Sequence, residues 1–69
     1  MKTIPINSSN IKAIFYDDTS KKLLVFFYHN SLYTYTISEK QVSEFMNAED
    51  KGKYFYENIR MSCPYKKIY

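Results

Sequence analysis

The chain has 69 residues, of which 45% are hydrophobic, and ten Lys and Arg outnumber seven Asp and Glu to give a net charge of +3. A chain of this length builds one small core, and its apolar content and weak charge exclude a disordered segment, so we expect a single domain over residues 1–69. No apolar run reaches about 18 residues and the first ten residues lack a signal-peptide core. This excludes a membrane partner and predicts a cytoplasmic protein, or one in the host cytoplasm if a phage encodes it.

The first two predicted strands come early in the chain. Residues 11–16 and residues 23–28 are rich in β-branched and aromatic residues, which favour strands. The polar segment 17–20 between them has the composition of a turn. The pattern therefore predicts two antiparallel strands joined by a short connection.

A hairpin loop and a third strand follow. His29 and Asn30 are predicted to form a two-residue loop, in which Asn30 takes the positive φ that such turns require. Residues 31–37 continue as a strand, and the period of two places Tyr33 and Tyr35 on one face. The first half of the chain is thus expected to be a three-stranded antiparallel meander.

A helix is predicted to begin after Ser38. Ser38 has the chemistry of an N-cap, and Gln41 three residues later completes a capping box. Val42, Phe45 and Met46 recur at helical spacing and form one apolar stripe. Because nothing else in the chain is large enough to cover this stripe, we expect it to pack on the sheet.

A second short helix is predicted behind an Asp50 cap, running through residues 54–57 with Phe55 and Ile59 on its inner side. Beyond Ile59 the chain is expected to run extended, which allows a short C-terminal strand. The predicted fold class is therefore α+β, with a three-stranded antiparallel meander followed by one or two short helices packed on one face.

Five short segments have the order and spacing of a known small domain. They are Ser8-Ser9-Asn10-Ile11, Tyr33-Thr34-Tyr35, Ala48, Lys51-Gly52-Lys53-Tyr54-Phe55 and Asn58-Ile59-Arg60. Over roughly residues 8–67 the chain resembles the KTSC domain, a family found at the C-terminus of some lysyl-tRNA synthetases and as stand-alone small proteins. The resemblance implies RNA binding, which has been suggested for the family through its synthetase association.

The chain departs from the family pattern on one face of the expected sheet. Apolar Leu24, Phe26 and Tyr28 stand where outward polar residues are expected, and Phe15 stands where a small residue is usual. An exposed apolar patch of this kind is typical of an interface, so we predict one at these four residues. Its occupant is left open between the basic C-terminal segment folded over it, a second copy forming a homodimer or higher homo-oligomer, and a host protein.

Aromatic and basic residues provide the candidate binding site. Eight Tyr and five Phe are more rings than one small core can hide. Residues 51–69 hold four Lys and one Arg against one Glu, a net charge of +4. The candidate ligand-binding residues are Tyr33, Tyr35, Lys51, Gly52, Lys53, Asn58, Arg60, Tyr65, Lys66 and Lys67.

Each group in this candidate site has a binding role and a structural alternative. Tyr33 and Tyr35 are spaced for base stacking, or they pack against Phe45 and Met46 in the core. Residues 51–53 could meet a phosphate through backbone N–H groups and two ammonium heads, or form an ordinary helix entry. The basic residues around Tyr65 form either a nucleic-acid-binding stripe or a solubilising tail.

Catalytic chemistry is not indicated. His29 has no second His or Cys for a metal site and no nucleophile beside it, and Cys63 is alone. We therefore predict no catalytic residue, no metal and no cofactor. The expected function is a non-catalytic module that binds single-stranded RNA or a nucleotide. The alternative is a phage or mobile-element protein that self-associates and binds a host protein or sequesters a nucleotide-like small molecule.

Overall fold

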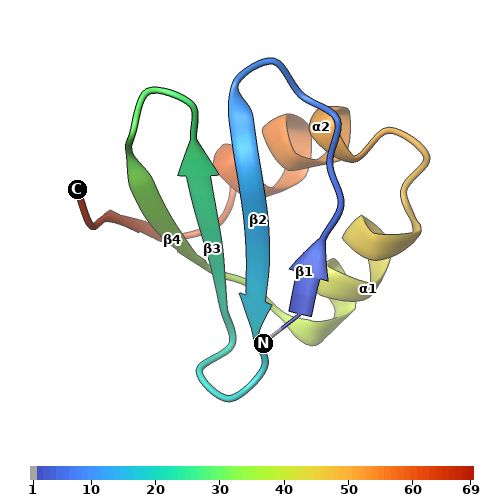
Figure 1. The fold of residues 1–69 in the computed structure, drawn as a ribbon. Helices are drawn as coiled ribbons and strands as arrows, with labels where there is room; N and C mark the ends of the chain where they lie inside the picture. The colour runs from blue at the N-terminus through green and yellow to red at the C-terminus, as the bar shows by residue number, and fades with distance from the viewer. Residues whose placement is uncertain (1) are drawn as a thin grey trace.

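A five-stranded antiparallel sheet with its strands in chain order forms one layer of the fold, and the helices form the other (Figure 1). The computed structural model describes residues 2–69. The elements are β1 (Lys2–Ile4), β2 (Ile11–Asp17), β3 (Lys22–Phe27), β4 (Leu32–Thr36), α1 (Glu39–Asn47), α2 (Lys51–Tyr54), η1 (Phe55–Arg60) and β5 (Tyr65–Lys67). The α+β class and the antiparallel meander are confirmed, whereas the predicted number of strands, three, is too small.

The two additional strands lie at the sheet edges. β1 pairs with β2, and this register sets Ile4 opposite Ile14, both buried in the core. At the other edge β5 pairs with β4, with Tyr65 opposite Tyr35. The extended C-terminal segment expected from the sequence is therefore a strand. It extends the sheet at its edge and does not fold over the outer face. The alternative in which the basic C-terminal segment covers the apolar patch on that face is therefore wrong.

The turn between β3 and β4 is longer than predicted. It spans residues 28–31, where the Asn30 N–H donates to the Phe27 carbonyl at 3.1 Å and the Phe27 N–H donates to the Ser31 carbonyl at 2.9 Å. Asn30 has the expected positive φ of 65°. A two-residue loop is thus replaced by a four-residue turn, and Tyr28 lies in this turn instead of on β3.

Helix α1 begins as predicted. The Gln41 N–H donates to Ser38 Oγ at 3.2 Å, and Gln41 Oε1 accepts from the Ser38 N–H at 3.2 Å, which completes the capping box. Val42 and Phe45 are buried, but Met46 is 38% exposed. The helix therefore rests on the sheet through a narrower stripe than the predicted one.

The second helix extends further than residue 57. The Asp50 side chain accepts the Lys53 N–H at 3.0 Å and caps α2. The chain then continues directly into the π-helix η1, and Phe55 and Ile59 both have no exposed surface. The core consequently lies between the sheet and the three helical segments. Within residues 2–69, no helix has the length and apolar character that crossing a bilayer would require.

Candidate functional site

A pocket of about 560 Å³ opens where β4 and β5 meet η1, on the helix side of the sheet. Its volume falls in the range of small-molecule binding sites. The strands supply one wall, η1 supplies a second, and the loops before β2 and after β3 supply the rest. Four of the ten candidate binding residues line it: Tyr33, Tyr35, Arg60 and Tyr65.

Three tyrosines form the sheet wall of the pocket. Tyr33 and Tyr35 are two residues apart on β4, so their side chains point to the same face. Their ring centroids are 6.4 Å apart and their ring planes are inclined by 21°. Tyr65 comes from β5, and its ring centroid lies 5.8 Å from each of the other two. The antiparallel pairing of β5 with β4 is what brings residues 30 positions apart into one aromatic cluster.

These rings differ in their exposure. Tyr35 is only 3% exposed and meets the buried Phe55 edge-on, with centroids 5.4 Å apart. Burial raises the pKa of the Tyr35 hydroxyl, and the nearby Arg60 charge opposes this rise. Tyr33 is half-buried and packs edge-on against Phe27 at 5.4 Å. Tyr65 is 63% exposed, so it lies at the open rim of the pocket.

The alternative that Tyr33 and Tyr35 pack against Phe45 and Met46 is not what the structure shows. Their aromatic contacts are with one another and with Phe27, Phe55 and Tyr65. Phe45 instead stacks on Tyr54, with centroids 5.6 Å apart. Tyr35 is therefore both a core residue and the floor of the pocket.

Arg60 supplies the positive charge at the pocket. Its guanidinium carbon lies 5.4 Å from the centroid of the Tyr56 ring, one helical turn earlier in η1. Asn10 Nδ2 donates to the Tyr56 hydroxyl at 3.4 Å. Within residues 2–69 the single ion pair joins Lys21 to Glu39, so no carboxylate neutralises Arg60. A cation–π contact orients the guanidinium and leaves its N–H donors available to an anion.

Five residues that line the pocket were not among the candidates predicted from the sequence. Phe27 and His29 stack with centroids 5.5 Å apart and planes 26° apart, and both line the pocket together with Asn10, Tyr56 and Met61. Tyr56 and Arg60 are four residues apart, and this spacing on a helix could have predicted their contact from the sequence. His29 and Asn10 gave no such signal, because each lies in a turn or bend whose path depends on tertiary contacts.

Residues 51–53 lie outside the pocket. Lys51 and Gly52 border a separate, more open hollow with Asp50 and the segment 5–7. The Asp50 carboxylate already accepts the Lys53 N–H. A Cβ at Gly52 would meet only Asp50 Oδ1, at 3.6 Å. This segment therefore has the geometry of an ordinary capped helix entry. Asn58 is exposed on η1 and does not line the pocket.

The predicted basic stripe around Tyr65 is divided by the strand geometry. Lys67 pairs with Tyr33 and faces the pocket side, whereas Lys66 pairs with Thr34 and faces the opposite side of the sheet. Lys66 and Lys67 are both exposed. The cations of this segment consequently serve two faces.

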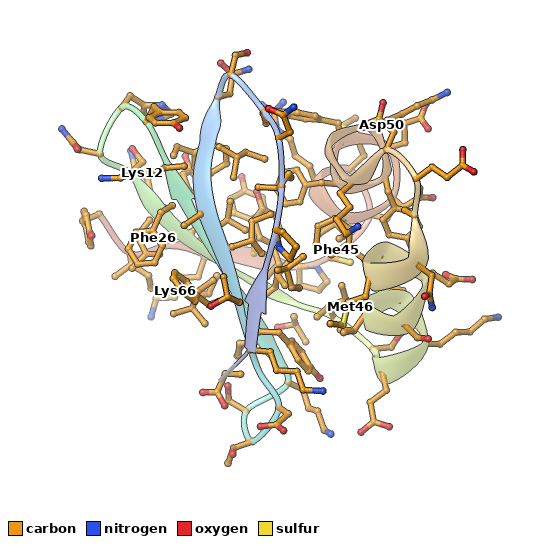
Figure 2. All side chains as sticks on the ribbon, turned by 45° about the vertical axis from the view of Figure 1, so that its right-hand side comes forward. Lys12, Phe26, Phe45, Met46, Asp50 and Lys66 are labelled. Atoms are coloured by element: carbon orange, nitrogen blue, oxygen red, sulfur yellow. The ribbon has the colours of Figure 1, made fainter. Side chains whose placement is uncertain are left out.

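The predicted interface residues lie on strands of the outer face, with one exception that lies in a turn. Phe15 and Leu24 are directly paired there, and the Phe15 and Phe26 rings meet edge-on with centroids 5.8 Å apart. All three are half-buried. Figure 2 shows Phe26 on the side of the sheet away from Phe45 and Met46. The exception is Tyr28, which is 60% exposed and lies beyond the end of β3, in the β3–β4 turn.

Other reactive groups show no site. Cys63 is buried, and burial raises the pKa of its thiol, so it has little thiolate character. Across residues 2–69 the structure contains no cluster of three His, Cys, Asp or Glu side chains that could hold a metal ion.

The chain is similar to known proteins over nearly its whole length. The family model described as the KTSC domain matches residues 7–63. The crystal structure of a KTSC domain protein from Yersinia pestis has 30% sequence identity to this chain and a TM-score of 0.79, and the alignment covers 99% of this chain and 97% of that one. Among proteins with curated descriptions, none matches.

Proposed function

The chain belongs to the KTSC domain family, as its motifs indicated, and we propose that it is a small non-catalytic binding module whose pocket holds a nucleotide unit of single-stranded RNA or of a free nucleotide. The observation that carries this proposal is the convergence of Tyr33, Tyr35 and Tyr65 with an unpaired Arg60 around one pocket. The resemblance to domains attached to lysyl-tRNA synthetases supports an RNA ligand.

The tyrosines suit the base of such a ligand. Tyr65 and Tyr33 present ring surface that is exposed or half-buried, and stacking on an aromatic side chain stabilises a bound base by about 1 to 3 kcal/mol. Tyr35 below them is fixed by Phe55. Because the wall is held rigid by strand pairing and by this edge-on contact, binding does not have to order it.

Arg60 suits the phosphate. A guanidinium forms two parallel hydrogen bonds to phosphate oxygens, and the Tyr56 ring holds the Arg60 group at the pocket wall. Lys67 adds a second cation on the same side of β5. The pocket therefore combines apolar ring faces with positive charge, which is the chemistry that a nucleotide requires.

The proposal is tested by fluorescence anisotropy with a fluorescein-labelled uridine decamer. We expect Tyr65→Ala and Arg60→Ala each to weaken binding about 10-fold, in line with one stacked base or one charged hydrogen-bond pair. The matched control is Lys53→Ala, which removes one exposed cation outside the pocket and should weaken binding less than 3-fold. Equal losses in Arg60→Ala and Lys53→Ala, with no loss in Tyr65→Ala, would show that binding depends only on net charge and would refute the pocket.

A nucleotide-like small molecule would use the same wall and the same guanidinium. Native mass spectrometry of protein purified from cells, with wild type and Arg60→Ala compared side by side, reveals a carried ligand of this kind. Co-purification of a nucleotide with wild type only would identify the free form as the ligand.

A further inference from the structure

The outer face of the sheet carries aromatic side chains without a covering layer. In the part of the chain that the structure describes, all helices lie on the other side (Figure 1). Phe15, Leu24 and Phe26 are each half-buried at the centre of this face. Aromatic rings on one face of an antiparallel sheet form the base-stacking surface of one class of RNA-binding domains.

The charges around these rings have one predominant sign. Lys12 lies at the bulge of β2, and Figure 2 shows Lys12, Phe26 and Lys66 on the same side of the sheet. Lys22 also faces outward, where its ammonium donates to Thr36 Oγ1 at 3.1 Å. Asp17 pairs with Lys22 at the end of the sheet.

The Asp17 carboxylate is already engaged by its own turn. It accepts the backbone N–H groups of Thr19 and Ser20 at 3.0 and 3.4 Å. These hydrogen bonds lower the pKa of Asp17. The rings are therefore bordered by three lysines and by one carboxylate that faces into the β2–β3 turn.

Strand β5 joins this face to the pocket. Lys67 lies on the pocket side and Lys66, the neighbouring residue, lies on the outer side. β5 is an edge strand of three exposed residues, and its far side pairs with no strand among residues 2–69. A polyanion bound in the pocket therefore meets one cation on each side of this narrow edge, Lys67 on the pocket side and Lys66 on the outer side.

We propose, on the basis of the function proposed above, that the ligand is an oligonucleotide strand which leaves the pocket, crosses β5 between Lys67 and Lys66, and stacks bases on Phe26 and Phe15 of the outer face. A second copy of the chain is the weaker fit for this face, because it would bring like charges together. A nucleic-acid strand supplies both the phosphates that pair with lysines and the planar bases that cover rings.

A length series tests this path. A strand that contacts Arg60 and Lys67 alone neutralises about two phosphates, and one that also reaches Lys12, Lys22 and Lys66 neutralises about five. The logarithm of the binding constant falls with the logarithm of the salt concentration, with a slope of about −0.7 per neutralised phosphate. Raising the salt concentration from 50 to 200 mM should therefore weaken the binding of a short strand about 7-fold and that of a long strand about 100-fold. We therefore expect a uridine decamer to bind at least 10-fold tighter than a trimer at low salt, with the steeper salt dependence.

Two outer-face variants separate this path from the pocket itself. Phe26→Leu keeps an apolar side chain but removes the ring, and Lys66→Ala removes a cation. Each should weaken the decamer at least 3-fold and leave the trimer unchanged, whereas Lys40→Ala on the exposed side of α1 should change neither. Circular dichroism checks that each variant is folded.

The outcomes distinguish the path from the pocket. Equal affinity of trimer and decamer, with pocket variants still weakening both, would overturn the outer-face path and leave the proposed function intact. No binding of either probe would overturn both. Light scattering that shows a dimer lost in Phe26→Leu, with decamer binding unchanged, would assign the outer face to a second copy and also overturn the path.

Discussion

Replacing Phe55 tests whether the pocket floor and the core are the same structure. Phe55 has no exposed surface, and its ring meets Tyr35 at 84° and Tyr56 at 77°, each with centroids 5.4 Å apart. Edge-on aromatic pairs stabilise by about 0.5 to 1.5 kcal/mol each beyond the area that they bury. Phe55→Leu should therefore lower the free energy of unfolding by about 1 to 3 kcal/mol.

That loss is large for this chain. At about 0.05 to 0.15 kcal/mol per residue, 69 residues give a total stability of roughly 3 to 10 kcal/mol. Phe55→Ala, which costs about 3 to 5 kcal/mol at a buried site, is expected to leave much of the protein unfolded. The leucine variant is therefore the useful one.

The assay is urea denaturation followed by circular dichroism and by tyrosine fluorescence, since the chain has no Trp. The matched control is Phe26→Leu, which removes a half-buried ring with one edge-on partner and should cost less than about 1 kcal/mol. If Phe55→Leu costs no more than Phe26→Leu, Phe55 does not support the tyrosine wall and the reasoning is refuted.

Three further changes have defined outcomes. Ser38→Ala removes the α1 cap and should cost about 1 kcal/mol in a urea titration; an unchanged midpoint would contradict the capping box. Gly52→Ala places a Cβ in ordinary contact with Asp50 and should raise stability by about 0.5 kcal/mol without changing RNA affinity, so weakened binding would return residues 51–53 to the site. Burial and the Glu44 carboxylate raise the pKa of Tyr54 to about 12, so the stability that Tyr54 adds over Tyr54→Phe is present below pH 10. It should shrink as the pH rises through 12, and a gap between the two urea midpoints that grows from pH 9 to pH 11 would contradict this.

The fold could be predicted wherever a local pattern determines it. The Ser38 capping box, the Asp50 cap and the positive φ of Asn30 each depend on a few neighbouring residues. β1 was missed because only three residues, ended by Pro5, form it. A strand so short is recognised only through its partner, β2, and no sequence window contains that pairing.

The candidate site was predicted only in part, because some of its features depend on local patterns and others on tertiary contacts. Tyr33 and Tyr35 share a face by strand periodicity, which one sequence shows. Whether they pack on Phe45 or on Phe55 depends on where η1 crosses the sheet, and the π-helical turn that carries Phe55 has no sequence signature in this chain. Lys66 and Lys67 looked like one stripe because adjacent residues separate onto two faces only once the segment pairs as a strand, and the pairing of β5 with β4 joins residues about 30 positions apart.

The most direct measurement is a two-dimensional NMR titration of the ¹³C,¹⁵N-labelled protein with a uridine decamer, in which the aromatic, arginine side-chain and backbone signals are all followed. If the pocket holds a nucleotide unit, the ring signals of Tyr65 and Tyr33 and the Arg60 side-chain signals move together and saturate with one affinity, while those of Tyr54 stay in place. Saturating shifts confined to Tyr54 and the backbone of residues 51–53, or no saturable shift in the tyrosine wall, would contradict the account.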